Sequence, residues 1–152
     1  MALERLRFAE HLRPRPKPSG IDAVTRLADF AIITYALPPP RAHPCVRVRF
    51  HLDTIDYGAG QRALLSVVPF RDLDFTAVAF PFPKWQFGQT NYRVYVRDRL
   101  NGERCVWFIG TTLASWTVNI PHYLWRLPWY RGRMQFDTEL VDGRYSRYEM
   151  ST

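Results

Sequence analysis

The chain has 152 residues, of which 47% are apolar, 15% aromatic and 23% charged. This length suits one domain that buries about two-thirds of its unfolded surface, and the composition excludes a disordered chain. No uncharged apolar run approaches the roughly 18 residues of a membrane-spanning helix, so we expect no integral membrane protein and no membrane partner. The first residues lack the hydrophobic segment of a secretory signal, which favours a cytoplasmic protein.

The net charge is +7, with 21 Lys and Arg residues against 14 Asp and Glu residues. Only Lys17 and Lys84 are lysines. The arginines are scattered along the chain, which is typical of a solvated surface, so nucleic acid is the less favoured partner. Basic residues and prolines gather in residues 1–20, which we interpret as a flexible arm. Residues 21–152 are then expected to form a single domain.

The cysteines and histidines give no sign of a metal centre. Cys45 and Cys105 lie in apolar runs without CxxC spacing. We interpret them as core residues of a protein in a reducing compartment rather than as a disulfide. The four histidines are widely spread and lie near no carboxylate pair, so we expect no metal site and no cofactor.

The hydrophobic pattern favours strands along most of the chain. Residues 21–28 are apolar with loosely helical spacing, and beyond them apolar runs, several with a period of two, are separated by turn residues or prolines. Three prolines at 38–40 should stop regular structure, because they remove three amide donors in a row. The predicted strands cover residues 30–35, 46–52, 63–68, 75–82, 89–97, 104–109, 134–138 and 145–150.

Two turns and one helix complete the prediction. Asn101-Gly102 and Asp142-Gly143 are strong hairpin signals. Residues 112–125 have helical apolar spacing, which predicts one principal helix within residues 111–126. The chain lacks a βαβ rhythm, a GxGxxG motif and a P-loop, which disfavours a nucleotide-binding fold. We therefore predict a mainly β (α+β) fold, an antiparallel β-cone or barrel with that helix packed on it.

The polar face of residues 89–97 is the most informative feature for function. Such a face is usually solvated, but this one is short of carboxylates and includes a tyrosine. Inside a barrel it could orient an anionic or carbonyl ligand, with Arg93 as a bidentate clamp. Because side chains alternate along a strand, one row would hold Gln89, Asn91, Arg93 and Tyr95.

Residues 89–96 resemble the signature of the YqjF-like proteins, a branch of unknown function in the acetoacetate decarboxylase superfamily. That branch has the pattern Glu-x-Asn-x-Arg-x-Tyr-Val. The resemblance covers roughly residues 30–150 and implies a β-cone or barrel that encloses a small-molecule cavity. Further similarities occur, in the expected order, at residues 67–70, 106–109, 127–134 and 143–147.

The resemblance also implies a departure from decarboxylase chemistry. In the decarboxylases a buried lysine forms a Schiff base with a β-keto acid, and desolvation and a neighbouring cation lower its pKa. The matching position here is Trp129, no lysine follows Lys84, and Gln89 replaces the carboxylate of the strand motif. Lys84 itself is interpreted as an exposed loop residue. Decarboxylation through a Schiff base is therefore not expected.

Three hypotheses for the function follow. The first is a domain that binds a small anionic or carbonyl ligand through the polar row and Trp129. Any reaction would then be of a non-decarboxylating lyase, isomerase or cyclase type, with Tyr95 as the acid and Arg93 as the electrostatic clamp, the two candidate catalytic residues. The second hypothesis is a non-enzymatic binding or interaction protein. The third is a nucleic-acid binder.

The resemblance further implies that relatives continue with additional strands. Either the fold here is minimal, the chain is truncated, or a second copy covers an open sheet edge; we expect a homodimer. A buried guanidinium is costly without a partner. We therefore expect Arg93 to contact a bound anion or a carboxylate such as Asp53, Asp56 or Glu139.

Overall fold

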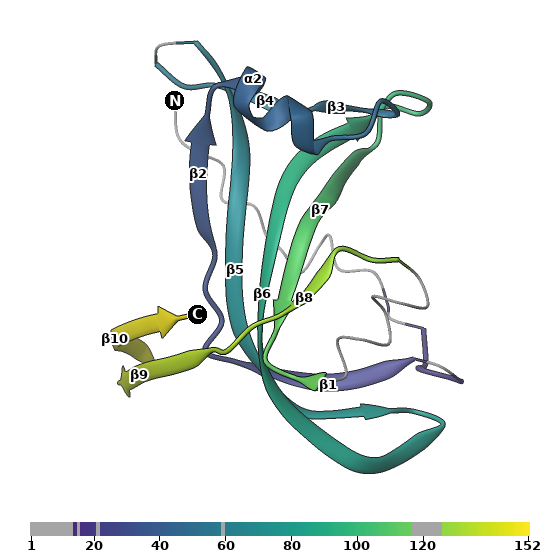
Figure 1. Cartoon of the computed structure of the whole chain (residues 1–152), viewed down its shortest axis with the longest axis vertical. Coiled ribbons are helices and arrows are strands. Elements are labelled where there is room, and N and C mark those ends of the chain that lie inside the picture. The colour runs from purple at the N-terminus through teal and green to yellow at the C-terminus, as the bar shows by residue number, and fades with distance from the viewer. Residues whose placement is uncertain (1–13, 15, 21, 59, 117–125) are drawn as a thin grey trace.

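A computed structural model gives the fold and describes residues 14, 16–20, 22–58, 60–116 and 126–152 (Figure 1). The arm expected over residues 1–20 lies largely outside the described residues. The helix expected within residues 111–126 also lies largely outside them. Its first residues, Thr111–Leu113, do not begin a helix but end a strand, because they pair with strands on both sides.

Strands make up most of the described chain, which confirms the prediction of a mainly β fold. A short helix, α2 (Pro39–Ala42), and a 3-10 turn, η1 (His43–Cys45), follow the second strand. The strands are β1 (Ala23–Ala28), β2 (Ile33–Leu37), β3 (Phe50–Leu52), β4 (Thr54–Asp56), β5 (Gln61–Ala77), β6 (Phe80–Asp98), β7 (Arg104–Leu113), β8 (Trp129–Arg131), β9 (Gln135–Val141) and β10 (Arg144–Ser151).

One long antiparallel hairpin, formed by β5 and β6, is the backbone of the main sheet (Figure 1). β7 pairs antiparallel with β6, and β8 pairs parallel with the end of β7. On the other side of β5, β2 and β1 pair with successive parts of that strand. Within the described residues the path from β1 to β8 does not close on itself, so a closed barrel stays a prediction.

β5 continues through Pro69, although the sequence pattern predicted that a strand would end there. The Pro69 carbonyl oxygen accepts a hydrogen bond from the Ala31 amide at 3.1 Å. A strand residue directs its amide and its carbonyl to the same edge, so the absent N–H of Pro69 faces the break between β1 and β2. The prediction was wrong because a gap in the neighbouring strands, which the local sequence does not show, accommodates the proline. β6 likewise contains Pro83, where a strand had been expected to end.

β5 and β6 separate beyond the pair of Leu65 and Val94, and β3 and β4 occupy the opening. β3 pairs with the end of β6, and β4 pairs with the start of β5. Figure 1 shows α2 across the same end of the sheet. Val94 and Val96 are 0% and 1% exposed, so the apolar face of β6 belongs to the core at this end.

The three prolines at 38–40 do not stop regular structure as expected. Pro39 and Pro40 begin α2, where the first amides of a helix have no intrahelical partner and a proline costs little. Cys45 and Cys105 are free thiols. Their expected place in the core is wrong, because Cys45 is exposed and Cys105 is only partly buried.

The strand predicted over residues 46–52 is confirmed only for its last three residues. The first pair of this strand joins Phe50 to Asp98, which is the last residue of β6. Residues 46–49 would extend past the end of β6, so they have no strand to pair with among the described residues, and Val48 is 91% exposed. These residues alternate with a period of two, but without a neighbouring strand the alternation does not produce a strand.

Both predicted hairpin turns are confirmed. Gly102, between β6 and β7, has a φ of +73°, and Gly143, between β9 and β10, has a φ of +74°. The hairpin of β9 and β10 forms a second sheet, and it packs against β6 at Gly88. A Cβ atom at Gly88 would lie 2.9 Å from the ring of Phe136. The absence of a side chain there lets the C-terminal hairpin approach the main sheet.

Candidate ligand-binding groove

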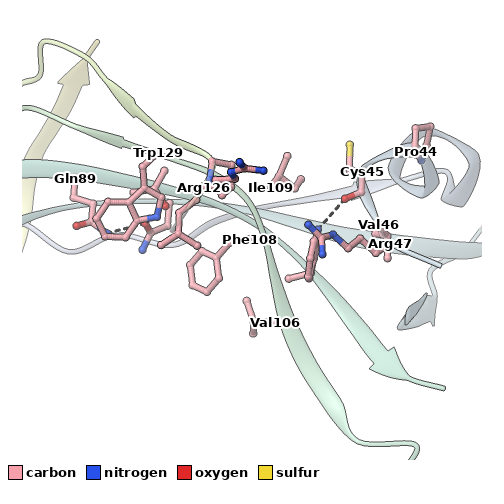
Figure 2. Close-up of a pocket in the computed structure, with 15 residues that line it drawn as sticks. Pro44, Cys45, Val46, Arg47, Gln89, Val106, Phe108, Ile109, Arg126 and Trp129 are labelled. Carbon is pink, nitrogen blue, oxygen red and sulfur yellow. Dashed lines mark hydrogen bonds between the residues drawn. The ribbon is translucent and has the colours of Figure 1, made fainter. Parts of the chain in front are cut away.

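A groove of about 970 Å³ runs along β7 and the residues that lead into β8. Gln89 and Asn91 of β6 and Thr111 of β7 contribute its polar surface. Figure 2 shows Trp129 toward the same end as Gln89, residues 44–47 at the opposite end, and Arg126 between them. The groove therefore joins three segments that are far apart in the sequence.

The Asn91 amide has a fixed orientation. Its Oδ1 accepts a hydrogen bond from Gln89 Nε2 at 2.8 Å and another from Thr111 Oγ1 at 3.0 Å. Because the oxygen side of the amide is occupied, the Nδ2 group points the other way, and within the described residues its two N–H donors remain for another acceptor. A carboxylate or a carbonyl oxygen is the matching acceptor for such a group.

Trp129 is held beside this amide by the parallel pairing of β8 with β7. Trp129 is the register partner of Thr111, and the Thr111 amide donates to the Pro128 carbonyl at 2.9 Å. Arg126 has a φ of +52°, a left-handed conformation at the point where the chain enters the groove wall. Trp129 occupies the position that the family resemblance assigns to the catalytic lysine, so the side chain there is an indole.

The charges that line the groove are positive. Arg47 and Arg126 line it, and its described lining contains no Asp or Glu. The Arg47 guanidinium lies 5.5 Å from the centre of the Trp107 ring, and Trp107 Nε1 donates to the Cys45 carbonyl at 2.9 Å. A concave surface with two guanidinium groups and no described carboxylate favours anions.

Arg93 and Tyr95 continue the row of Gln89 and Asn91 but are not among the residues that line the groove. The row is intact because β6 pairs with β5 without a bulge from Gln89 to Val94. The Tyr95 hydroxyl is hydrogen-bonded to Ser66 Oγ at 3.0 Å. The structure thus brings Gln89, Asn91 and Trp129 to one groove and places Arg93 and Tyr95 beside it.

Arg93 has no partner of the expected kind among the described residues. Its Nε is buried and forms no hydrogen bond in this part of the chain. Asp53, one of the expected partners, contacts Arg97 at 2.8 Å and Arg104 at 3.2 Å instead. Asp53 is therefore not the partner of Arg93, because its position after β3 places it at the Arg97 end of β6, and contact with a bound anion stays a prediction. A buried donor without a partner is a group that a bound anion could satisfy.

Other candidate sites receive no support. Lys84 is exposed on the β5–β6 hairpin, and its Nζ lies 4.0 Å from Asp74. Where the chain is described, no three His, Cys, Asp or Glu residues gather closely enough to hold a metal ion. The described helices are also too short or too polar to cross a membrane.

Sequence reasoning missed most of the groove lining, including two polar residues, Thr111 and Arg126, that it had assigned to a helix. Thr111 had been assigned to the start of a helix, although it continues the alternation of Val106 and Phe108 on one side of β7 once a bulge near Ile109 is allowed. Arg126 had been assigned to the end of that helix. The only sequence signal in this region was a helical apolar pattern next to a hairpin strand, and that pattern led to both residues being assigned to a helix.

Comparison with known proteins agrees with this fold. The model of the DUF2071 family, described as an uncharacterized conserved protein, matches residues 24–151. Among solved structures the chain is similar to acetoacetate decarboxylase from Legionella pneumophila subsp. pneumophila str. Philadelphia 1, with a TM-score of 0.58 and 19% sequence identity. The match covers 91% of this chain and 51% of the decarboxylase, so the chain spans about half of that protein's length. No curated protein matches the chain.

Proposed function

Because the chain belongs to the DUF2071 family and has an acetoacetate decarboxylase-like fold, we propose that its groove binds a small organic anion or carbonyl compound. The observation that carries this proposal is the orientation of the Asn91 amide. Gln89 and Thr111 occupy its oxygen, so among the described residues its N–H donors are available to a carboxylate or a carbonyl. Trp129 at the same end adds a flat apolar surface, and Arg126 in the middle of the groove adds a positive charge.

The proposal excludes decarboxylation through a Schiff base. Lys84 is the last lysine in the chain, and it is exposed on the hairpin rather than desolvated in the groove. Turnover would instead be carbonyl chemistry of the lyase, isomerase or cyclase type. In that reaction Tyr95 would act as the acid and Arg93 as the electrostatic clamp.

Binding without turnover is the second candidate function. The Tyr95 hydroxyl is engaged with Ser66, whose Oγ is also 2.8 Å from the Thr34 hydroxyl. Tyr95 also lies outside the groove lining. Both facts favour a domain that holds its ligand and does not transform it.

We also propose a cytoplasmic homodimer that uses no cofactor. Two free thiols are compatible with a reducing compartment. Within the described residues the main sheet does not close on itself, and a second copy could cover one of its free edges. Light scattering that shows only monomer at high protein concentration would contradict the dimer.

Isothermal titration with acetate, pyruvate and butyrate tests the binding function. We expect saturable binding that Asn91→Asp abolishes, since the new carboxylate repels an anion and removes the N–H donors. Asn101→Asp is the matched control, because Asn101 lies in the exposed β6–β7 turn, where its Oδ1 accepts from the Glu103 amide. Equal affinities in the two variants, or no carboxylate binding by the wild type, would show that the groove has another role.

A further inference from the structure

The groove is much larger than a short keto acid needs. Its volume of about 970 Å³ lies at the upper end of the range of pockets that enclose drug-sized molecules. The oriented amide of Asn91, however, lies beside Gln89 at one end of the groove, and Arg126 lies between the two ends. Most of the remaining surface is therefore available to a part of the ligand that makes no hydrogen bonds.

The wall beyond the polar end is apolar and only partly covered. Phe108 and Val106 line it and are 44% and 41% exposed. In the described chain, β7 has a strand on its outer side only from Thr111 onward, so no strand covers these two side chains. The distance along β7 from Thr111 to Val106 is roughly 17 Å, at about 3.4 Å per residue. An extended apolar chain fits such a wall.

Resting on the proposed function, we propose that the natural ligand is a carboxylate with an extended apolar chain. The carboxylate accepts from Asn91 Nδ2 and pairs with Arg126. The apolar chain lies along Phe108 and Val106 and removes their exposed surface from water. Charge and apolar surface are both needed, because Asn91 and Arg126 line the same groove as Phe108 and Val106.

The positions of the two guanidinium groups also determine how the ligand is oriented in the groove. Arg47, the second guanidinium in the groove, is stacked on Trp107, and Figure 2 shows it at the end opposite Gln89, the residue that holds the Asn91 amide. A carboxylate bound at Arg47 would contact a positive charge but not the Asn91 amide, whereas a carboxylate bound at Arg126 would contact a positive charge and that amide. The apolar chain therefore points from Asn91 toward the η1 end of the groove.

Titration of the whole chain with butyrate, hexanoate and octanoate tests this inference, with octylamine as the charge control. Each added CH₂ group should tighten binding by roughly two- to fourfold, as expected for burial of apolar surface. Octylamine should not bind. Arg126→Met should weaken octanoate binding about tenfold, as loss of a charge-assisted contact does. Arg47→Met should weaken it less, because Arg47 is stacked on Trp107 at the other end of the groove, and Arg99→Met, on the exposed β6–β7 turn outside the groove, should leave the affinity unchanged.

Two substitutions examine the apolar wall. Val106→Thr keeps the side-chain shape and the preference for a strand, and it should reduce the gain in affinity with chain length. Phe108→Ser should reduce it further. Phe82→Ser is the matched control, since Phe82 is 70% exposed on the β5–β6 hairpin, outside the groove. Thermal melts establish that each variant is folded.

The possible failures are distinguishable. If butyrate and octanoate bind equally well, the extended chain is wrong and the proposed function stands. If no carboxylate binds, both proposals fail. If octylamine binds as tightly as octanoate, or if Arg47→Met loses more affinity than Arg126→Met, the carboxylate does not sit at Asn91 and Arg126, and the inference is overturned.

Discussion

Tyr148 donates a hydrogen bond from its hydroxyl to the backbone carbonyl of Asp29 at 2.7 Å, across 119 positions of sequence. The Asp29 carboxylate accepts from Thr138 Oγ1 at 2.8 Å and forms an ion pair with Arg71. Asp29 has a φ of +49°, and it lies in the break between β1 and β2. Asp29 thus holds the C-terminal hairpin to the main sheet through both its backbone and its side chain.

We expect Tyr148→Phe to lower the free energy of unfolding by about 1–2 kcal/mol, because the Asp29 carbonyl loses its donor in a partly buried place. Urea denaturation measures this change. Tyr57→Phe is the control, since Tyr57 is 65% exposed, and it should have no effect. A Tyr148→Phe variant as stable as the wild type would show that the hairpin is held by packing alone.

The same hydroxyl predicts a loss of stability in alkali. Burial, together with the nearby Asp29 charge and Tyr145, raises the pKa of Tyr148 to about 12. An unfolded tyrosine has a pKa of about 10. The folded state therefore keeps the proton more tightly, and the contribution of Tyr148 is complete below pH 10 and is lost as the pH rises toward 12. The difference in stability between wild type and Tyr148→Phe should shrink over that window.

Gly88→Ala should destabilise the protein by about 1–3 kcal/mol through overpacking. The new Cβ would lie 2.9 Å from a Phe136 ring carbon and 3.1 Å from Met134 Cβ, so the β9–β10 hairpin must move. Gly110→Ala is the matched control. There the nearest atoms are 3.5 Å away, which is ordinary contact, and denaturation should show little change. Equal effects of the two substitutions would contradict the close packing of the hairpin on β6.

Much of the architecture was predictable because its causes are local. Asn101-Gly102 and Asp142-Gly143 form their turns through the backbone freedom of their own residues. The period of two in β6 correctly placed Gln89 and Asn91 on one side, and Trp129, which the family resemblance singled out, lines the same groove; its role stays a prediction. The break that accommodates Pro69 and the contacts of Asp29 depend on residues far away in sequence. No local pattern encodes them.

Asp72→Asn should stabilise the protein at neutral pH, on the order of 1 kcal/mol. Asp72 is 4% exposed, its Oδ2 has no described partner, and burial raises the pKa of its carboxyl group despite a hydrogen bond from Thr25. A raised pKa means that the folded state prefers the protonated acid. The stability of the wild type should therefore fall as the pH rises from about 4 through the folded pKa.

Asparagine at position 72 removes that dependence, so the two proteins should converge in stability at acidic pH. Asp56→Asn is the control, because Asp56 is exposed. Thermal melts at a series of pH values measure the difference. Parallel pH profiles for wild type and Asp72→Asn would mean that Asp72 is solvated in the folded state.

Arg93→Met should weaken carboxylate binding by less than Arg126→Met does and leave the fold intact, because Arg93 lies beside the groove and not in its lining. The buried Nε of Arg93 has no described partner, so its removal breaks no ion pair in this part of the chain, and stability should change by less than about 1 kcal/mol. Val94→Asp, one residue along, should cost more than about 4 kcal/mol and unfold the domain, because Val94 is 0% exposed on the opposite face of β6. Arg99→Met on the exposed β6–β7 turn controls for net charge. Titration with butyrate separates the outcomes: if Arg93→Met binds as well as Arg99→Met, Arg93 does not contact the ligand, and the site ends at Asn91.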